Sequence, residues 1–88
     1  MRYVMNSVEY EVVDKILTES HLDEIIWIQQ RETDDGLEDY CYDVEENTDI
    51  TLKEGLEIIY DAVIFDEMSG QDIYVFKALL RKVGVKVD

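Results

Sequence analysis

The chain has no proline, four glycines and one cysteine among its 88 residues. Nothing in it resembles a linker, so we expect a single domain over residues 1–88. Cys41 excludes an internal disulfide and is typical of a protein from a reducing compartment. Residues 1–15 lack the apolar core of an export signal, and no run approaches the roughly 18 apolar residues of a membrane span. These absences predict a cytoplasmic protein that neither enters nor binds membranes.

Residue types suited to catalysis are also scarce. His21 is the only histidine, Cys41 has no histidine near it in the sequence, and the glycines form no phosphate-binding loop. The many carboxylates show no spacing that would select an acid–base pair. We therefore expect no enzyme activity, no catalytic residue and no bound cofactor.

Positive charge is low relative to negative charge. The 22 acidic residues outnumber 8 basic ones, which gives a formal charge of -14. Such an excess favours rapid encounter with cationic surfaces and disfavours direct binding to nucleic acids or anionic membranes. The apolar fraction of 47% is ordinary for a globular protein. We expect a folded acidic domain whose partner is basic.

Apolar residues at helical spacing predict an N-terminal helix of about three turns, which Asn6 and Ser7 are suited to cap. Its stripe consists of Val8, Val12, Val13, Ile16 and Leu17. The alternative is a strand in which Val8, Tyr10 and Val12 alternate with acidic residues. We favour the helix.

Two further helices are predicted near the C-terminus, at about 52–65 and 70–83. Thr51 and Glu54 form a capping box at the start of the first, and Ser69 caps the second. Gly84 ends the second helix. The short link between them implies an antiparallel pair.

A β-hairpin is predicted between the helical regions, with strands at about 24–31 and 38–45. The first contains the sequence IIWI, and Asp35-Gly36 supplies a tight turn. In the second strand, alternation places Tyr40, Tyr42 and Val44 on one face and Asp39, Cys41 and Asp43 on the other. The expected fold is α+β: a small antiparallel sheet, the C-terminal helix pair on one face and the N-terminal helix nearby.

Residues 32–49 carry nine acidic residues and no base. Such a run is typical of a solvated or disordered segment, but the interleaved aromatic and aliphatic residues favour an ordered acidic surface. Carboxylates two residues apart on a strand are about 6.6 Å apart, within a factor of two of the spacing of DNA phosphates. The candidate partner-binding residues are Asp34, Asp35, Glu38, Asp39, Tyr40, Tyr42, Asp43, Glu45, Glu46 and Asp49.

Two roles are open for the tyrosines of this segment. Exposed, Tyr40 and Tyr42 would add aromatic anchors to a binding surface. Packed against the helix pair, they would belong to the core. We favour packing for both.

Residues 43–54 also resemble the calcium loop of an EF-hand. Oxygen-bearing side chains stand at loop positions 1, 3, 5, 7, 9 and 12, namely Asp43, Glu45, Asn47, Asp49, Thr51 and Glu54. However, Thr48 stands where the loop needs glycine, a strand precedes the segment in place of a helix, and no second loop exists. Calcium binding is therefore an alternative to the partner-binding hypothesis.

In size, in the acidic stretch TDDGLEDYCYDVEENTD and in its expected α+β fold, the chain resembles small acidic inhibitors from phages and mobile elements. That class includes anti-CRISPR proteins and DNA-mimic anti-restriction proteins, and antitoxins and nuclease immunity proteins share its acidic character. The resemblance includes no common motif, so it assigns no residue roles. It implies a non-enzymatic inhibitor that occupies the DNA-binding surface of a nuclease or similar effector. A small acidic adaptor or assembly subunit is the alternative, and the oligomeric state stays open.

Overall fold

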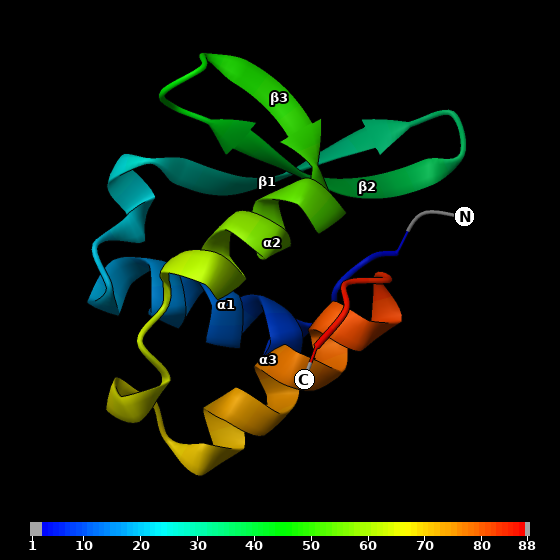
Figure 1. The fold of residues 1–88 in the computed structure, drawn as a ribbon. Coiled ribbons are helices and arrows are strands. Elements are labelled where there is room, and N and C mark those ends of the chain that lie inside the picture. Colours follow the sequence, from blue (N-terminus) through cyan, green and yellow to red (C-terminus); the bar gives the residue numbers. More distant parts are fainter. Residues whose placement is uncertain (1–2, 88) are drawn as a thin grey trace.

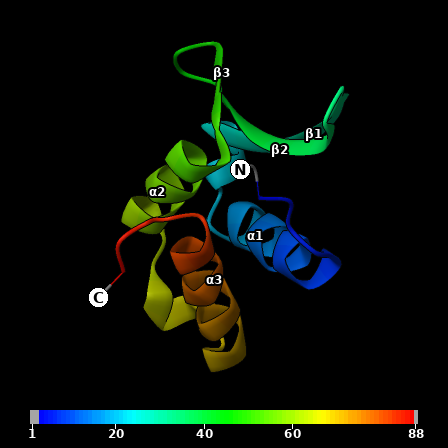
Figure 2. The same ribbon diagram turned by 90° about the vertical axis from the view of Figure 1, so that its right-hand side faces the viewer.

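The computed structural model describes residues 3–87, which form three α-helices and one three-stranded antiparallel sheet (Figure 1). All three helices lie on the same side of the sheet (Figure 2). The α+β prediction is confirmed. None of the helices in residues 3–87 is long and apolar enough to cross a membrane. The elements in order are α1 (Ser7–Glu19), a 3₁₀ turn (Leu22–Glu24), β1 (Ile26–Thr33), β2 (Gly36–Asp43), β3 (Thr48–Thr51), α2 (Leu52–Ala62), a second 3₁₀ turn (Phe65–Glu67) and α3 (Gly70–Lys82).

The helices begin at the residues that the capping signals indicate. Asn6 and Glu9 form a reciprocal capping box on α1, so the alternative strand interpretation of this segment is wrong. Thr51 and Glu54 form the expected box on α2, and the Ser69 side chain accepts a hydrogen bond from the backbone of α3. Each cap satisfies backbone N–H groups that the first helical turn leaves without a helical partner.

One helix end differs from its predicted position. The helix α2 stops at Ala62, before the expected residue 65, because Val63 adopts an extended conformation. The helix α3 ends as expected: Gly84 takes a φ of +91°, and the Val85 N–H donates to the Leu80 carbonyl at 2.8 Å. Val85 is thereby turned back into the core, where it is buried.

The sheet order is β1-β2-β3, and the turn between β1 and β2 consists of Asp34 and Asp35. Gly36 follows this turn with a φ of +111°, a value that glycine adopts without strain. The two hairpin strands therefore continue closer to the turn than predicted, and they are 26–33 and 36–43. The third strand was not predicted, and it pairs only with residues 40–43 of β2.

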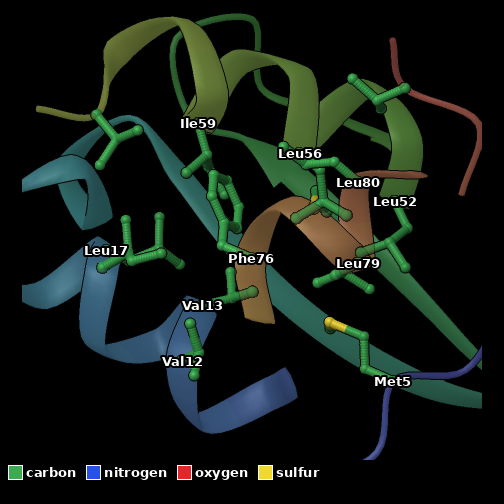
Figure 3. Packing of buried hydrophobic residues seen from close by; sticks show 14 of the residues in the cluster. Met5, Val12, Val13, Leu17, Leu52, Leu56, Ile59, Phe76, Leu79 and Leu80 are labelled. Atoms are coloured by element: carbon green, nitrogen blue, oxygen red, sulfur yellow. The ribbon is translucent and has the colours of Figure 1, made fainter. Parts of the chain in front are cut away.

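The core lies between the helices and the inner surface of the sheet, and α3 fills its centre (Figure 3). Phe76, Leu79 and Leu80 of α3 are fully buried, as are Leu56 and Ile59 of α2. Helix α3 packs chiefly against α1, whereas α2 packs against β2. The helix layer therefore fixes which surface of the sheet stays uncovered.

Helix and sheet approach each other closely at Gly55 of α2. A Cβ atom added to Gly55 would lie 2.2 Å from Cys41 Sγ and 3.2 Å from Ile26 Cδ1. Burial, followed by the negative charge of Asp39, raises the pKa of the Cys41 thiol to about 12. Cys41 is therefore a core residue of the inner surface and not a reactive thiol.

Candidate protein-binding face

The strand β2 turns opposite surfaces to the helices and to solvent. Because Cys41 packs beneath Gly55, the alternating residues Tyr40 and Tyr42 point away from the helices. The predicted alternation is correct, but the expected packing of both tyrosines against the helix pair is wrong, because the surface with Cys41 is the one that faces the helices. We term the uncovered surface of the sheet the outer face. Its side chains include Trp27, Gln29 and Arg31 from β1, Glu38, Tyr40 and Tyr42 from β2, and Asp49 from β3.

Asp39 lies on the inner surface and is only 5% exposed, so its predicted exposure at a partner-binding surface is wrong. Its Oδ2 accepts a hydrogen bond from the Met5 backbone N–H at 2.7 Å, and its Oδ1 accepts one from Gln30 Nε2 at 3.0 Å. These two donors offset the cost of burying the carboxylate. The role of Asp39 is to fasten the N-terminal segment to the sheet.

Replacing Asp39 by alanine is expected to lower the free energy of unfolding by about 1–2 kcal/mol, because the buried Met5 N–H loses its acceptor. Urea unfolding followed by circular dichroism measures the change. Asp34→Ala, which removes an exposed carboxylate at the hairpin turn, is the matched control and should shift stability by less than about 0.5 kcal/mol. Equal stability of the two variants would contradict the fastening role.

Two aromatic rings stack on the outer face, near the start of β1 and the end of β2. Trp27 and Tyr42 stack with ring centroids 5.3 Å apart and an interplanar angle of 27°. Trp27 is 45% exposed, and its indole N–H donates to the Asp23 carbonyl at 2.8 Å. The Tyr42 hydroxyl donates to Asn47. The stack is thus held in a fixed orientation while much of the indole remains accessible.

Beside the stack lies a cluster centred on Arg31. Its guanidinium carbon is 4.1 Å from the centre of the Tyr40 ring, and its Nε is 3.0 Å from Glu38 Oε2. Its Nη1 is 3.4 Å from Asp49 Oδ2. The Tyr40 hydroxyl donates to Gln29 at 2.8 Å. Glu38 and Asp49 are therefore brought together as the partner-binding hypothesis requires, but around a base of the same chain.

The remaining acidic candidates lie at the two ends of the sheet. The turn between β2 and β3 lies beside the Leu22–Glu24 turn, since the Val44 N–H donates to the Ile25 carbonyl at 3.0 Å (Figure 1). We term this region the acidic end; it comprises Asp23, Glu24, Asp43, Glu45 and Glu46. Asp34 and Asp35 lie at the opposite end, in the hairpin turn. The eight residues of β2 separate the two groups by roughly 23 Å.

The calcium alternative is not supported by the arrangement of residues 43–54. This segment is occupied by β3 and the start of α2, and the Glu54 carboxylate accepts hydrogen bonds from the Thr51 N–H at 3.1 Å and hydroxyl at 2.9 Å. Asp43 Oδ1 accepts one from the Glu46 N–H at 3.1 Å. Within residues 3–87, no group of three or more Asp, Glu, His or Cys side chains is placed to hold a metal ion.

A pocket of about 430 Å³ opens beside the outer face, where β3 ends and leaves residues 36–39 of β2 without a second strand neighbour. Its lining includes four carboxylates and three bases. Arg31, Glu38, Tyr40 and Asp49 form its wall on the outer face. The mixed charge gives no preference for a small anion or cation.

Trp27, Gln29 and Arg31 were not among the predicted site residues. The signal for Trp27 was the alternation of IIWI, in which Ile26 and Ile28 share the surface opposite to the indole. In the sequence, Arg31 is simply the base that directly precedes the acidic run. Its neighbours become evident only once the strand register is known.

Comparison with known proteins assigns no family and no function to this chain. No protein-family model, no curated protein and no solved structure matches the chain.

Proposed function

We propose that this protein is a cytoplasmic, non-enzymatic inhibitor that binds the basic, nucleic-acid-binding surface of another protein, such as a nuclease. Its carboxylates would take the places of nucleic-acid phosphates. This is the activity of the small acidic inhibitors from phages and mobile elements that the sequence resembles in kind.

The uneven distribution of charge supports this proposal most directly. Residues 16–52, which include the whole sheet, contain twelve acidic residues and one base, Arg31. The remaining residues contain ten acidic residues and seven bases. Acidity that served only solubility would not need to be concentrated on one layer of the fold. Charge placed in this way favours one orientation of approach to a cationic partner.

The mechanism would be competition for the partner's lysine and arginine side chains. Long-range attraction speeds the encounter and weakens as salt is added. Short charge-assisted hydrogen bonds to arginine then fix the register of the complex. The ordered strands hold the carboxylates in place, which lowers the conformational entropy that binding must remove.

Neutralising four exposed acidic residues of the acidic end should weaken inhibition more than tenfold. The variant changes Asp23, Glu24, Glu45 and Glu46 to the corresponding amides. DNA-binding proteins retained by the immobilised wild-type protein serve as partners, and fluorescence anisotropy measures how each protein inhibits their binding to labelled duplex DNA. The matched control neutralises four exposed acidic residues outside this layer: Glu57, Asp61, Asp66 and Glu67.

Three results would support the proposal. Inhibition by the wild type falls with added salt, the control variant retains this inhibition, and the acidic-end variant loses it. If the two variants inhibit equally, the fixed arrangement of charge is irrelevant and the proposal is wrong. The proposal is also wrong if no DNA-binding protein is retained, or if retained proteins bind DNA unchanged.

A further inference from the structure

The outer face already contains an arginine in the geometry that a foreign arginine would adopt. The Arg31 guanidinium stacks on the Tyr40 ring and lies between Glu38 and Asp49, at the distances given above. We term these three partners of Arg31 the guanidinium site. The ring face of Tyr40 contacts the flat surface of the guanidinium. The two carboxylates, from neighbouring strands, accept hydrogen bonds from its N–H groups and balance its charge.

This arrangement suits arginine better than lysine. A guanidinium is planar and weakly hydrated, so it stacks on a ring while its N–H groups reach carboxylates at the sides. An ammonium group is more strongly hydrated and has no flat surface to stack. The Tyr40 hydroxyl is fixed by Gln29, so the ring is oriented before any ligand arrives.

Arg31 itself can leave the site without loss of the fold. Its side chain is 46% exposed, and ion pairs formed by exposed bases contribute little to stability. The core residues lie on the other surface of the sheet. An incoming arginine would therefore compete only with weak contacts.

The Trp27–Tyr42 stack offers an apolar contact next to this site. Tyr42 and Asp49 are directly opposite each other across β2 and β3, so the stack adjoins one carboxylate of the guanidinium site. Tryptophan, tyrosine and arginine are the residue types that contribute most to binding energy in protein interfaces. No helix of residues 3–87 lies on this surface (Figure 2).

We propose that the outer face docks an arginine-bearing segment of a partner protein, whose guanidinium replaces Arg31 on Tyr40 while neighbouring side chains cover Trp27 and Tyr42. The inference rests on the proposed function and specifies its contact surface and preferred residue. A second copy of this chain is disfavoured as the occupant, because each copy has a formal charge of -14.

The single tryptophan of the chain makes this docking directly observable. Deca-arginine and deca-lysine peptides, matched in charge, are titrated while Trp27 fluorescence is recorded at physiological salt. We expect deca-arginine to bind about fivefold more tightly than deca-lysine and to change the Trp27 emission, since stacking on tyrosine adds roughly 1 kcal/mol.

Variants of the ring test the stacking contact. Tyr40→Leu keeps an apolar side chain but removes the ring, so the preference for deca-arginine should disappear. The matched control is Tyr74→Leu on α3, where the tyrosine is 71% exposed and distant from the sheet in sequence. Thermal unfolding establishes that both variants are folded before peptides are compared.

Removing Arg31 tests the exchange. Arg31→Gln should increase the arginine-over-lysine affinity ratio, because the incoming guanidinium no longer has a competitor. Lys86→Gln, an equal charge change at another exposed base, should leave that ratio unchanged.

Equal affinity for the two peptides, an unchanged preference in Tyr40→Leu, or a lower ratio in Arg31→Gln would each overturn the docking inference. Absence of binding by deca-arginine would overturn it as well. The inhibition of DNA binding and its loss in the acidic-end variant are judged separately, so the proposed function can survive failure of this inference.

Discussion

Gly55→Ala is expected to lower the free energy of unfolding by about 2–3 kcal/mol. The new methyl group would overlap the Cys41 side chain, at 2.2 Å from Sγ and 2.6 Å from Cβ, so the helix or the strand must move. Alanine raises helix propensity by about 1 kcal/mol relative to glycine, which offsets only part of this cost. Urea unfolding measures the stability change.

The thiol of Cys41 gives a second, local measurement of the same change. Its raised pKa, about 12, and its burial make it unreactive in the folded protein near neutral pH. Separation of α2 from β2 should speed its reaction with a thiol reagent. Gly70→Ala is the control, because its added methyl group would have no atom within 4 Å other than its chain neighbours and its own helix backbone. An unchanged stability of Gly55→Ala would show that the helix does not approach the sheet this closely.

Glu9→Gln is expected to lower the free energy of unfolding by about 2–3 kcal/mol at neutral pH. Glu9 is 3% exposed and accepts hydrogen bonds from the Tyr3 hydroxyl at 2.6 Å, the Asn6 N–H at 3.0 Å and Lys82 Nζ at 3.0 Å. It therefore joins the N-terminal segment, the start of α1 and the end of α3. An amide carries no charge and cannot satisfy all three donors.

The same residue predicts a pH dependence. Burial alone would raise the pKa of Glu9, but the hydrogen bonds from Tyr3, Asn6 and Lys82 outweigh it and lower the pKa below its ordinary value of 4.5. A lowered folded-state pKa stabilises the fold above the unfolded value and loses this contribution as pH falls through the folded value. The stability difference between wild type and Glu9→Gln should thus be constant above about pH 5.5 and shrink below pH 4.5.

The matched control is Glu11→Gln, an equal charge change at an exposed position of the same helix. Its stability should differ from wild type by less than about 0.5 kcal/mol at neutral pH. A difference between wild type and Glu9→Gln that stays constant from neutral pH to pH 3 would contradict the lowered pKa.

Local signals in the sequence predicted the helices well. The caps at Asn6, Thr51 and Ser69 act on neighbouring backbone groups, and Gly84 acts through its own φ angle. Such signals depend on few residues and need no knowledge of the rest of the fold. The early end of α2 at Ala62 was less predictable, since the apolar pattern continues beyond it.

The strand surfaces were less predictable, because they depend on distant residues. Asp39 can face the helices only because Met5 and Gln30 supply hydrogen-bond donors to its carboxylate. Cys41 can face them only because Gly55 has no side chain and leaves room for the thiol. The sequence-based interpretation assigned the aromatic residues to the core. Alternation along the strand then placed Tyr40 and Tyr42 toward the helices, whereas they point to solvent. The candidate site still includes both tyrosines and the exposed carboxylates at the two ends of the sheet. It no longer includes Asp39, and it now includes Trp27 and Arg31 from β1.

The position of α3 at the centre of the core also constrains how the chain folds during synthesis. Phe76, Leu79 and Leu80 complete the packing of α1, and Val85 closes the end of α3. Helices α1 and α3, which are far apart in the sequence, must therefore pack together before the core is complete. While the ribosome still holds residues 70–85, the sheet and α1 have no partner for much of their apolar surface. Cooperative folding is accordingly expected only once residues 70–85 have emerged from the ribosome, so chaperone access before that point would affect the yield of this protein.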